Sequence, residues 1–243
     1  MLAVTGGKGG TGKTTTTLGV AAALARRGVE TVAVDADWDL PDLGALAGVP
    51  RRSESIVSIE SIGPVDADDP TDAVEPVVDP GVESRSFPGV RVVPAPTDPA
   101  DRDPGRSLRA VRSSLATGIA GLLDCPAGAG PDAVAPLRVA DAALLVTEPC
   151  AASLRDAAKA GEMARALDAP VVGAVLTRAR FVPPGVADLL GCSVLACVPR
   201  ADSPVLSAEP VRASYDDAAA ALAETPAANV PLEREKPLNP GGS

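Results

Sequence analysis

The chain has 243 residues, a net charge of −10 and no histidine, and these figures exclude several classes of site and partner. Without histidine there can be no His-based catalytic triad, no histidine general base and no His-ligated metal centre. An acidic protein gains little from the counterion release that drives non-specific DNA binding, so we expect no direct DNA binding.

Hydrophobic and helical patterns alternate along the chain. Aromatic residues make up only 2% of the sequence, so the core is expected to consist of Ala, Val and Leu. Apolar runs predict strands at 2–5, 31–34, 90–93, 142–146, 171–176 and 194–198, with one more ending at Asp124. Helical spacing predicts helices at 13–27, 107–116, 151–167 and 211–223, and a short one at 41–47. The alternation predicts an α/β fold, a doubly wound and mainly parallel sheet with helices on both faces.

An acidic stretch interrupts this alternation. Residues 53–103 carry twelve acidic side chains and three arginines, so nearly all of the excess negative charge lies there. Residues 51–88 show no clear period, and we predict a long acidic insertion or surface loop, with short strands around 56–62 as an option. It is interpreted either as a functional loop or as a solvated spacer. We expect residues 1–224 to form a single domain and residues 225–243 a flexible tail.

Two expectations concern the environment of the protein. No run of 18 or more uncharged apolar residues occurs, and a strand pattern opens the chain, so we expect neither a membrane span nor a secretory leader. The four cysteines form no C-x-x-C pair and are expected to be reduced and buried in a cytoplasmic protein. Four lysines against many aspartates would suit a cytoplasm rich in salt.

The segment from Gly7 to Thr14 satisfies G-x-x-x-x-G-K-[ST], the phosphate-binding loop. Its glycines allow positive φ angles and let backbone N–H groups approach phosphate oxygens. Lys13 would reach the β- and γ-phosphates, and the Thr14 hydroxyl would ligate Mg²⁺. The following helix would direct its positive N-terminal end at the same anion. We therefore predict nucleotide binding over the alternative of a plain glycine-rich turn.

Three carboxylates are expected at strand ends near this loop. Asp35 and Asp37 follow the second predicted strand, and Asp124 ends a later one. Ligands bind at the carboxyl ends of strands in such sheets, where these carboxylates could hold Mg²⁺ directly or through water. The alternative is that Asp35 and Asp37 are ordinary turn residues.

Together these motifs resemble the MinD/ParA family of deviant Walker-A ATPases. The resemblance lies in a second loop lysine, Lys8, and in VDAD at 34–37, DCPAG at 124–128, TR at 177–178 and VP at 198–199. It covers about residues 1–222 and leaves 53–88 and the tail unmatched. The D-x-P-A-G string and the lack of a basic surface make the chain more similar to MinD than to ParA.

The resemblance implies a slow ATPase that dimerises when it binds ATP and Mg²⁺. Lys8 would cross the dimer interface to the partner subunit's phosphates, and Asp37 would position the attacking water. The implied catalytic residues are Lys8, Lys13 and Asp37, and the implied metal ligands are Thr14, Asp35 and Asp124. The implied nucleotide contacts are Gly7, Lys8, Gly9, Gly10, Thr11, Gly12, Lys13, Thr14, Thr15, Thr177, Arg178, Pro199 and Arg200.

Two departures from the family pattern change these expectations. The family commonly has Asn-Arg where this chain has Thr177-Arg178, so adenine selectivity would rest more on the backbone near Pro199 and Arg200. The C-terminal tail carries prolines and balanced charge in place of a basic amphipathic helix, so we expect no direct membrane binding by that route.

Trp38 is interpreted as core filler, with partner docking as the alternative.

The leading hypothesis is a MinD-like ATPase switch that positions or partitions cellular machinery. It would be cytoplasmic and recruited to the membrane or the cell pole through an unidentified protein partner or activator. The alternatives are a ParA-like partition ATPase, a biosynthetic ATP-dependent ligase of the same fold, and a nucleotide-binding adaptor that does not hydrolyse ATP.

Overall fold

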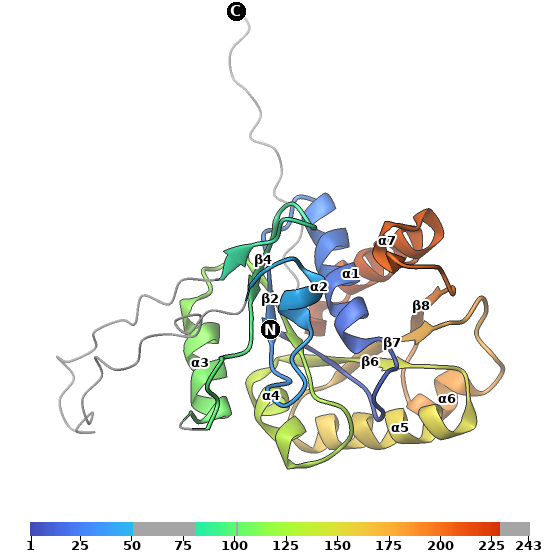
Figure 1. Cartoon of the computed structure of the whole chain (residues 1–243). Helices are drawn as coiled ribbons and strands as arrows, with labels where there is room; N and C mark the ends of the chain where they lie inside the picture. Colours follow the sequence, from blue (N-terminus) through green and yellow to red (C-terminus); the bar gives the residue numbers. More distant parts are fainter. Residues whose placement is uncertain (51–80, 101, 229–243) are drawn as a thin grey trace, which may run out of the picture.

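The computed structural model describes residues 1–50, 81–100 and 102–228. These residues contain an eight-stranded sheet of order β3-β4-β2-β5-β1-β6-β7-β8 (Figure 1). Of the described strands, β3 is the one that runs antiparallel to its neighbour. The strands are β1 Leu2–Thr5, β2 Thr31–Asp35, β3 Val82–Glu83, β4 Val90–Val93, β5 Ala120–Asp124, β6 Ala142–Thr147, β7 Val171–Thr177 and β8 Val194–Val198.

Helices cover both faces of this sheet. One face packs against α1, α2 and α7, and the other against α3, α4, α5 and α6 (Figure 1). No helix in the described ranges is long and apolar enough to cross a membrane. The helices are α1 Lys13–Arg26, α2 Leu43–Leu46, α3 Pro104–Ser114, α4 Val134–Val139, α5 Ala151–Ala166, α6 Val186–Leu190 and α7 Glu209–Ala223.

The central strand β1 shows why its short sequence reads as continuously apolar. Leu2 and Val4 pack toward α1 and α7, whereas Ala3 packs toward the opposite layer. Successive strand residues point to opposite faces, so a strand covered on both sides needs apolar residues at every position. The doubly wound, mainly parallel sheet expected from the sequence is confirmed.

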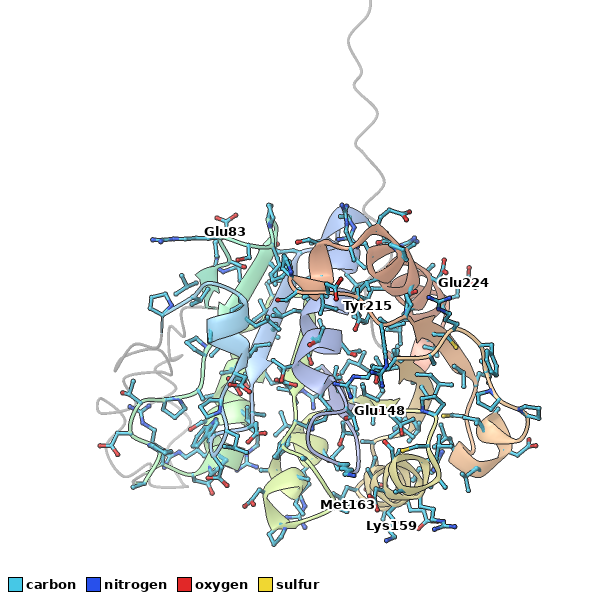
Figure 2. The ribbon with its side chains drawn as sticks, turned by 45° about the vertical axis from the view of Figure 1, so that its right-hand side comes forward. Glu83, Glu148, Lys159, Met163, Tyr215 and Glu224 are labelled. Atoms are coloured by element: carbon cyan, nitrogen blue, oxygen red, sulfur yellow. The ribbon has the colours of Figure 1, made fainter. Side chains whose placement is uncertain are left out.

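Small side chains let the helices approach one another closely. Tyr215 on α7 is 1% exposed and lies between α1 and α7 (Figure 2). A Cβ atom added at Gly19 of α1 would lie 2.4 Å from Cδ2 and Cε2 of its ring. The Tyr215 hydroxyl is 3.2 Å from Oγ1 of Thr16 on α1, which fixes the ring in place. The contact between these helices therefore depends on glycine at position 19.

The sequence analysis missed three short elements and placed the start of one helix too late. Val82 and Glu83 form β3 inside the expected loop at 51–88, and α4 and α6 were not expected at all. The helix expected at 107–116 begins earlier, because the Asp103 side chain accepts a hydrogen bond from the Arg106 N–H and Pro104 occupies the first turn.

The boundary of the tail expected at 225–243 was also placed too early in the sequence. Residues 226–228 form a 3₁₀ turn, and Ala228 is 1% exposed in the core. The remainder of the expected insertion, 51–80, and of the tail, 229–243, lies outside the described residues.

We expect Gly19→Ala to destabilise the protein by about 1–3 kcal/mol, because the new methyl group would overlap the buried Tyr215 ring. Thermal unfolding would then occur about 2–10 °C lower. Alanine is intrinsically the better helix former, so any loss reports the overlap itself.

Gly130→Ala is the matched control, because nothing lies within 4 Å of its Cβ position. A Gly19→Ala protein as stable as wild type and Gly130→Ala would contradict the close contact between α1 and α7.

Candidate functional site

The loop at residues 6–12 leaves the sheet at its topological switch point. It follows β1, which lies between β5 and β6, where the winding of the chain reverses direction. A Cβ atom at Gly7 would lie 2.0 Å from the carbonyl carbon of Asp156, so the loop backbone rests directly on α5. Gly12 has φ of 91° and leads into α1, a conformation that favours glycine. The free N–H groups of the first turn of α1 therefore face the space enclosed by the loop.

The two lysines of the loop differ in their surroundings. Lys13 is 7% exposed, whereas Lys8 is exposed at the loop tip with Gly9 and Gly10. Within the described part of the chain neither lysine forms an ion pair. The Lys8 carbonyl accepts a hydrogen bond from the Thr11 hydroxyl at 3.2 Å, which ties the loop tip to its own base. One ammonium is thus held inside the loop and the other projects from it.

Asp35 and Asp124 are buried side by side. They are paired residues at the ends of the parallel strands β2 and β5, with exposed fractions of 1% and 2%. Asp35 accepts backbone hydrogen bonds from Asp37 at 3.2 Å and Leu43 at 3.3 Å. The Asp124 carboxylate accepts a hydrogen bond from the side-chain hydroxyl of Thr17 at 3.2 Å. The register of the sheet, not the sequence spacing, brings these carboxyl groups together.

This arrangement raises the pKa of both carboxyl groups. Burial, with the neighbouring Asp124 as a second cause, raises the pKa of Asp35 to about 8. Burial raises the pKa of Asp124 to about 6, although hydrogen bonds from Thr14 and Thr17 and the charge of Lys13 act in the opposite direction. A cation held beside such a pair would favour the ionised form of both groups.

A magnesium ion fits this chemistry. Carboxylate and hydroxyl oxygens from Asp35, Asp124 and Thr14 are the hard ligands that it prefers. In the described ranges no three acidic or thiol side chains converge on one point. A cation here would therefore also need phosphate oxygens and water, as magnesium commonly does in nucleotide sites.

Asp37 lies near Lys13 and lines a cavity of about 660 Å³. It is half-buried, burial raises its pKa, and its carboxylate accepts a hydrogen bond from the Leu40 N–H at 3.1 Å. Trp38 is also half-buried, and its indole N–H donates to the Asp35 carbonyl at 3.2 Å while its ring packs against the core. The expectation that Trp38 fills core space is thus met in part.

The remaining candidate residues line a cavity of about 430 Å³ on the other side of the loop. Thr177, Arg178, Pro199 and Arg200 contribute to its wall, together with Thr11, Gly12 and Thr15. The Arg178 guanidinium pairs with Glu148, which lies beside this edge of the sheet (Figure 2). All the candidate residues therefore meet along one edge, on the two sides of the phosphate loop.

Sequence reasoning missed several groups that support the site, and it wrongly expected one cysteine to be buried. Thr17 lies three residues after Thr14, on the same face of α1, and helical spacing could have indicated its contact with Asp124. No local signal could have indicated the contacts that Asp156, Glu148 and Tyr215 make with distant parts of the chain. Among the cysteines, Cys125 is buried as expected, but Cys150 is exposed at the start of α5, so that expectation was wrong for it.

Comparisons with known proteins found a matching family model and similar sequences. The family described as the CobQ/CobB/MinD/ParA nucleotide binding domain matches residues 2–203. The septum site-determining protein MinD of Synechocystis is 33% identical over 192 residues, which cover 74% of this chain and 65% of that protein. The chain spans 63–65% of the length of such curated relatives.

Solved structures agree with the observed topology. The cell division ATPase MinD of Pyrococcus furiosus superposes with a TM-score of 0.71 at 27% identity, covering 92% of this chain and 98% of the other. MinD of Pyrococcus horikoshii, solved with Mg-ADP, gives a TM-score of 0.69 at 24% identity, covering 90% of this chain and 93% of the other.

The raised pKa of Asp35 leads to a prediction about stability and pH. The folded state keeps a proton that the unfolded chain releases near pH 4, so this stabilisation is complete below about pH 4 and is lost as the pH rises through about 8. With EDTA present, the unfolding temperature of wild type should fall between pH 5 and pH 9. Asp35→Asn should reduce that fall by at least about 3 °C, measured by calorimetry.

The exposed Asp132 provides the control, since Asp132→Asn should leave the pH dependence of wild type unchanged. If Asp35→Asn followed the same pH dependence as wild type, the carboxyl pair would not be protonated in the way described.

Proposed function

Because the chain belongs to the CobQ/CobB/MinD/ParA nucleotide-binding domain family, we propose that it is an ATPase switch that binds ATP with Mg²⁺ and dimerises in doing so. The observation that supports this most directly is the buried Lys13, held at the N-terminus of α1 close to the buried Asp124, which is itself paired with Asp35. A buried ammonium, free helix N–H groups and a carboxylate pair together are suited to a polyphosphate and a divalent cation. Mg-ADP in the Pyrococcus horikoshii protein of the same fold is consistent with that proposal.

In this proposal each loop residue has a distinct role. Lys13 binds the β- and γ-phosphates, and the N–H groups and hydroxyls of Thr14 and Thr15 bind phosphate oxygens and metal. Asp35 and Asp124 hold the cation directly or through water. When bound, Mg²⁺ would neutralise charge on the transferred phosphate.

Asp37 is the proposed positioning group for water. Asp37 is half-buried, lines the cavity of about 660 Å³ and lies close enough to Lys13 for the lysine charge to act on its carboxylate. A carboxylate placed there can accept a hydrogen bond from a water molecule and orient it toward the terminal phosphate. Because positioning and charge neutralisation supply most of the catalysis in phosphoryl transfer, slow turnover is expected.

Lys8 is the proposed link between subunits. Its side chain is exposed at the loop tip and forms no ion pair within the described residues, so it is available to a second copy of the chain. A lysine that reaches the partner's terminal phosphate would make that phosphate part of the interface. Hydrolysis would then weaken the dimer and reset the switch.

The cellular role is proposed from the relatives. Proteins named for septum-site determination and cell division share the family and the fold, which favours a role in positioning cellular machinery through a protein partner. A single domain for residues 1–224 and a cytoplasmic protein recruited to its site by that partner belong to the same proposal.

A ligase of the same fold is the second candidate, because a cavity of about 660 Å³ opens beside Asp37. Trp38, Arg109 and Arg138 are among the residues that line it, and they could hold an acidic substrate next to the terminal phosphate. ATP turnover by the purified protein without any added acceptor would favour the switch over the ligase.

We predict that wild-type protein elutes as a dimer in gel filtration with ATP and Mg²⁺, and as a monomer without nucleotide. Asp37→Ala should lower hydrolysis about 100-fold or more and make the dimer persist, because the water is no longer positioned. Lys13→Ala should bind nucleotide at least about tenfold more weakly, since a buried charged contact is lost. Lys8→Ala should bind nucleotide as a monomer.

Lys159→Ala is the matched control for Lys8→Ala. Lys159 is 70% exposed and projects from α5 (Figure 2), so its removal should change neither dimerisation nor turnover. The proposal of an ATP-dependent dimer fails if wild type and Asp37→Ala both remain monomeric with ATP and Mg²⁺.

A further inference from the structure

The cavity of about 430 Å³ beside the phosphate loop is where a bound nucleotide would place its base. It opens next to Thr11, Gly12 and Thr15, and its far wall comes from the ends of β7 and β8. A nucleotide whose phosphates lie in the loop can extend its ribose and base into this space. Base selectivity then depends on which polar groups of the wall are free to contact the base edge.

Thr177 ends β7 inside this wall, but its hydroxyl is already engaged. It is 6% exposed and donates a hydrogen bond to the Thr11 carbonyl at 2.7 Å, with the Thr147 carbonyl a further acceptor at 3.3 Å. Its methyl group lies next to Gly12, 3.4 Å from the position of an added Cβ atom there. The hydroxyl thus connects the phosphate loop to the sheet and leaves an apolar methyl group beside the loop.

Two other buried or partly buried side chains of the wall are also satisfied, and Thr15, in the first turn of α1, is assigned to phosphate in the proposed site. The Tyr215 hydroxyl contacts Thr16, and the Arg178 guanidinium pairs with Glu148. Arg200 and Asp202 are exposed and form no hydrogen bond or ion pair within the described residues. The polar side chains left to contact the base edge are therefore those of exposed residues in contact with water.

Strong discrimination between similar ligands requires buried polar groups that the wrong ligand leaves unpaired. The side chains of this cavity provide none, and the backbone at 199–202, where contacts with adenine were expected, belongs to residues that are half-buried or exposed. We propose that Thr177 is a positioning residue for the phosphate loop and that the base cavity accepts guanine as well as adenine nucleotides. This inference rests on the proposed nucleotide binding and extends its substrate class to purine nucleoside triphosphates.

The test is displacement of a fluorescent ATP analogue from the full chain by ATP and by GTP, with Mg²⁺ present. We expect the two dissociation constants to agree within about tenfold. A preference for ATP above about tenfold would overturn the inference while leaving the ATPase proposal intact. Failure of both nucleotides to displace the analogue would remove the ATPase proposal and the inference together.

Thr177→Val and Thr177→Ser separate a role in positioning the loop from direct contact with the base. Valine keeps the shape but loses the hydroxyl, so ATP and GTP should both bind about 3- to 10-fold more weakly, with their ratio unchanged. Serine keeps the hydroxyl and should restore binding of both nucleotides. The unfolding temperature of each variant is measured to confirm that it is folded.

A change in the ratio of ATP to GTP affinity in Thr177→Val would mean that the hydroxyl contacts the base, and would overturn the inference. Equal affinities in wild type and Thr177→Val would overturn the positioning role.

Discussion

Two carboxyl groups buried against each other, Asp35 and Asp124, are the constraint around which the site is built. Neighbouring acids out of contact with water are costly unless protons or cations compensate their charge, and their raised pKa values express that cost. Lys13, the Thr17 hydroxyl and the backbone of the segment after β2 all lie where they reduce it. In the proposed function, an incoming cation with its phosphate ligand would complete the charge balance of this site.

Close packing of the loop backbone depends on the unusual composition of the chain. A core of Ala, Val and Leu lets α5 approach the sheet until the backbone of Gly7 touches the backbone of Asp156. The absence of a side chain at Gly19 likewise lets α1 contact the Tyr215 ring. As a result the phosphate loop is supported by α5 on one side and by Thr177 on the other. Its tip, with Lys8, remains exposed.

The two sides of the loop differ in character. On the side of β7 and β8 the hydroxyl groups of Thr177 and Tyr215 are paired within the protein, and the proposed weak selection of the base rests on this pairing. On the side of Asp37 the segment after β2 is half-buried, carries the exposed Leu40 and borders the larger cavity. In the proposed switch, contacts that change with the terminal phosphate, whether to a second copy of the chain or to a partner, would form on that side.

The sequence by itself determined the alternation of strands and helices, the phosphate loop and the chemistry of its residues. Those features are local, because Gly, Lys and Thr at fixed spacing dictate one loop and apolar periodicity dictates the elements. The tertiary structure decided which distant groups meet. The strand register paired Asp35 with Asp124, and the packing of β7 beside the loop let the Thr177 hydroxyl donate a hydrogen bond to the Thr11 carbonyl. It also formed the short helices α4 and α6 and strand β3, whose few residues carry too little pattern to be recognised. Contacts between residues so far apart in the chain leave no periodic trace in the sequence, so only the fold could show them.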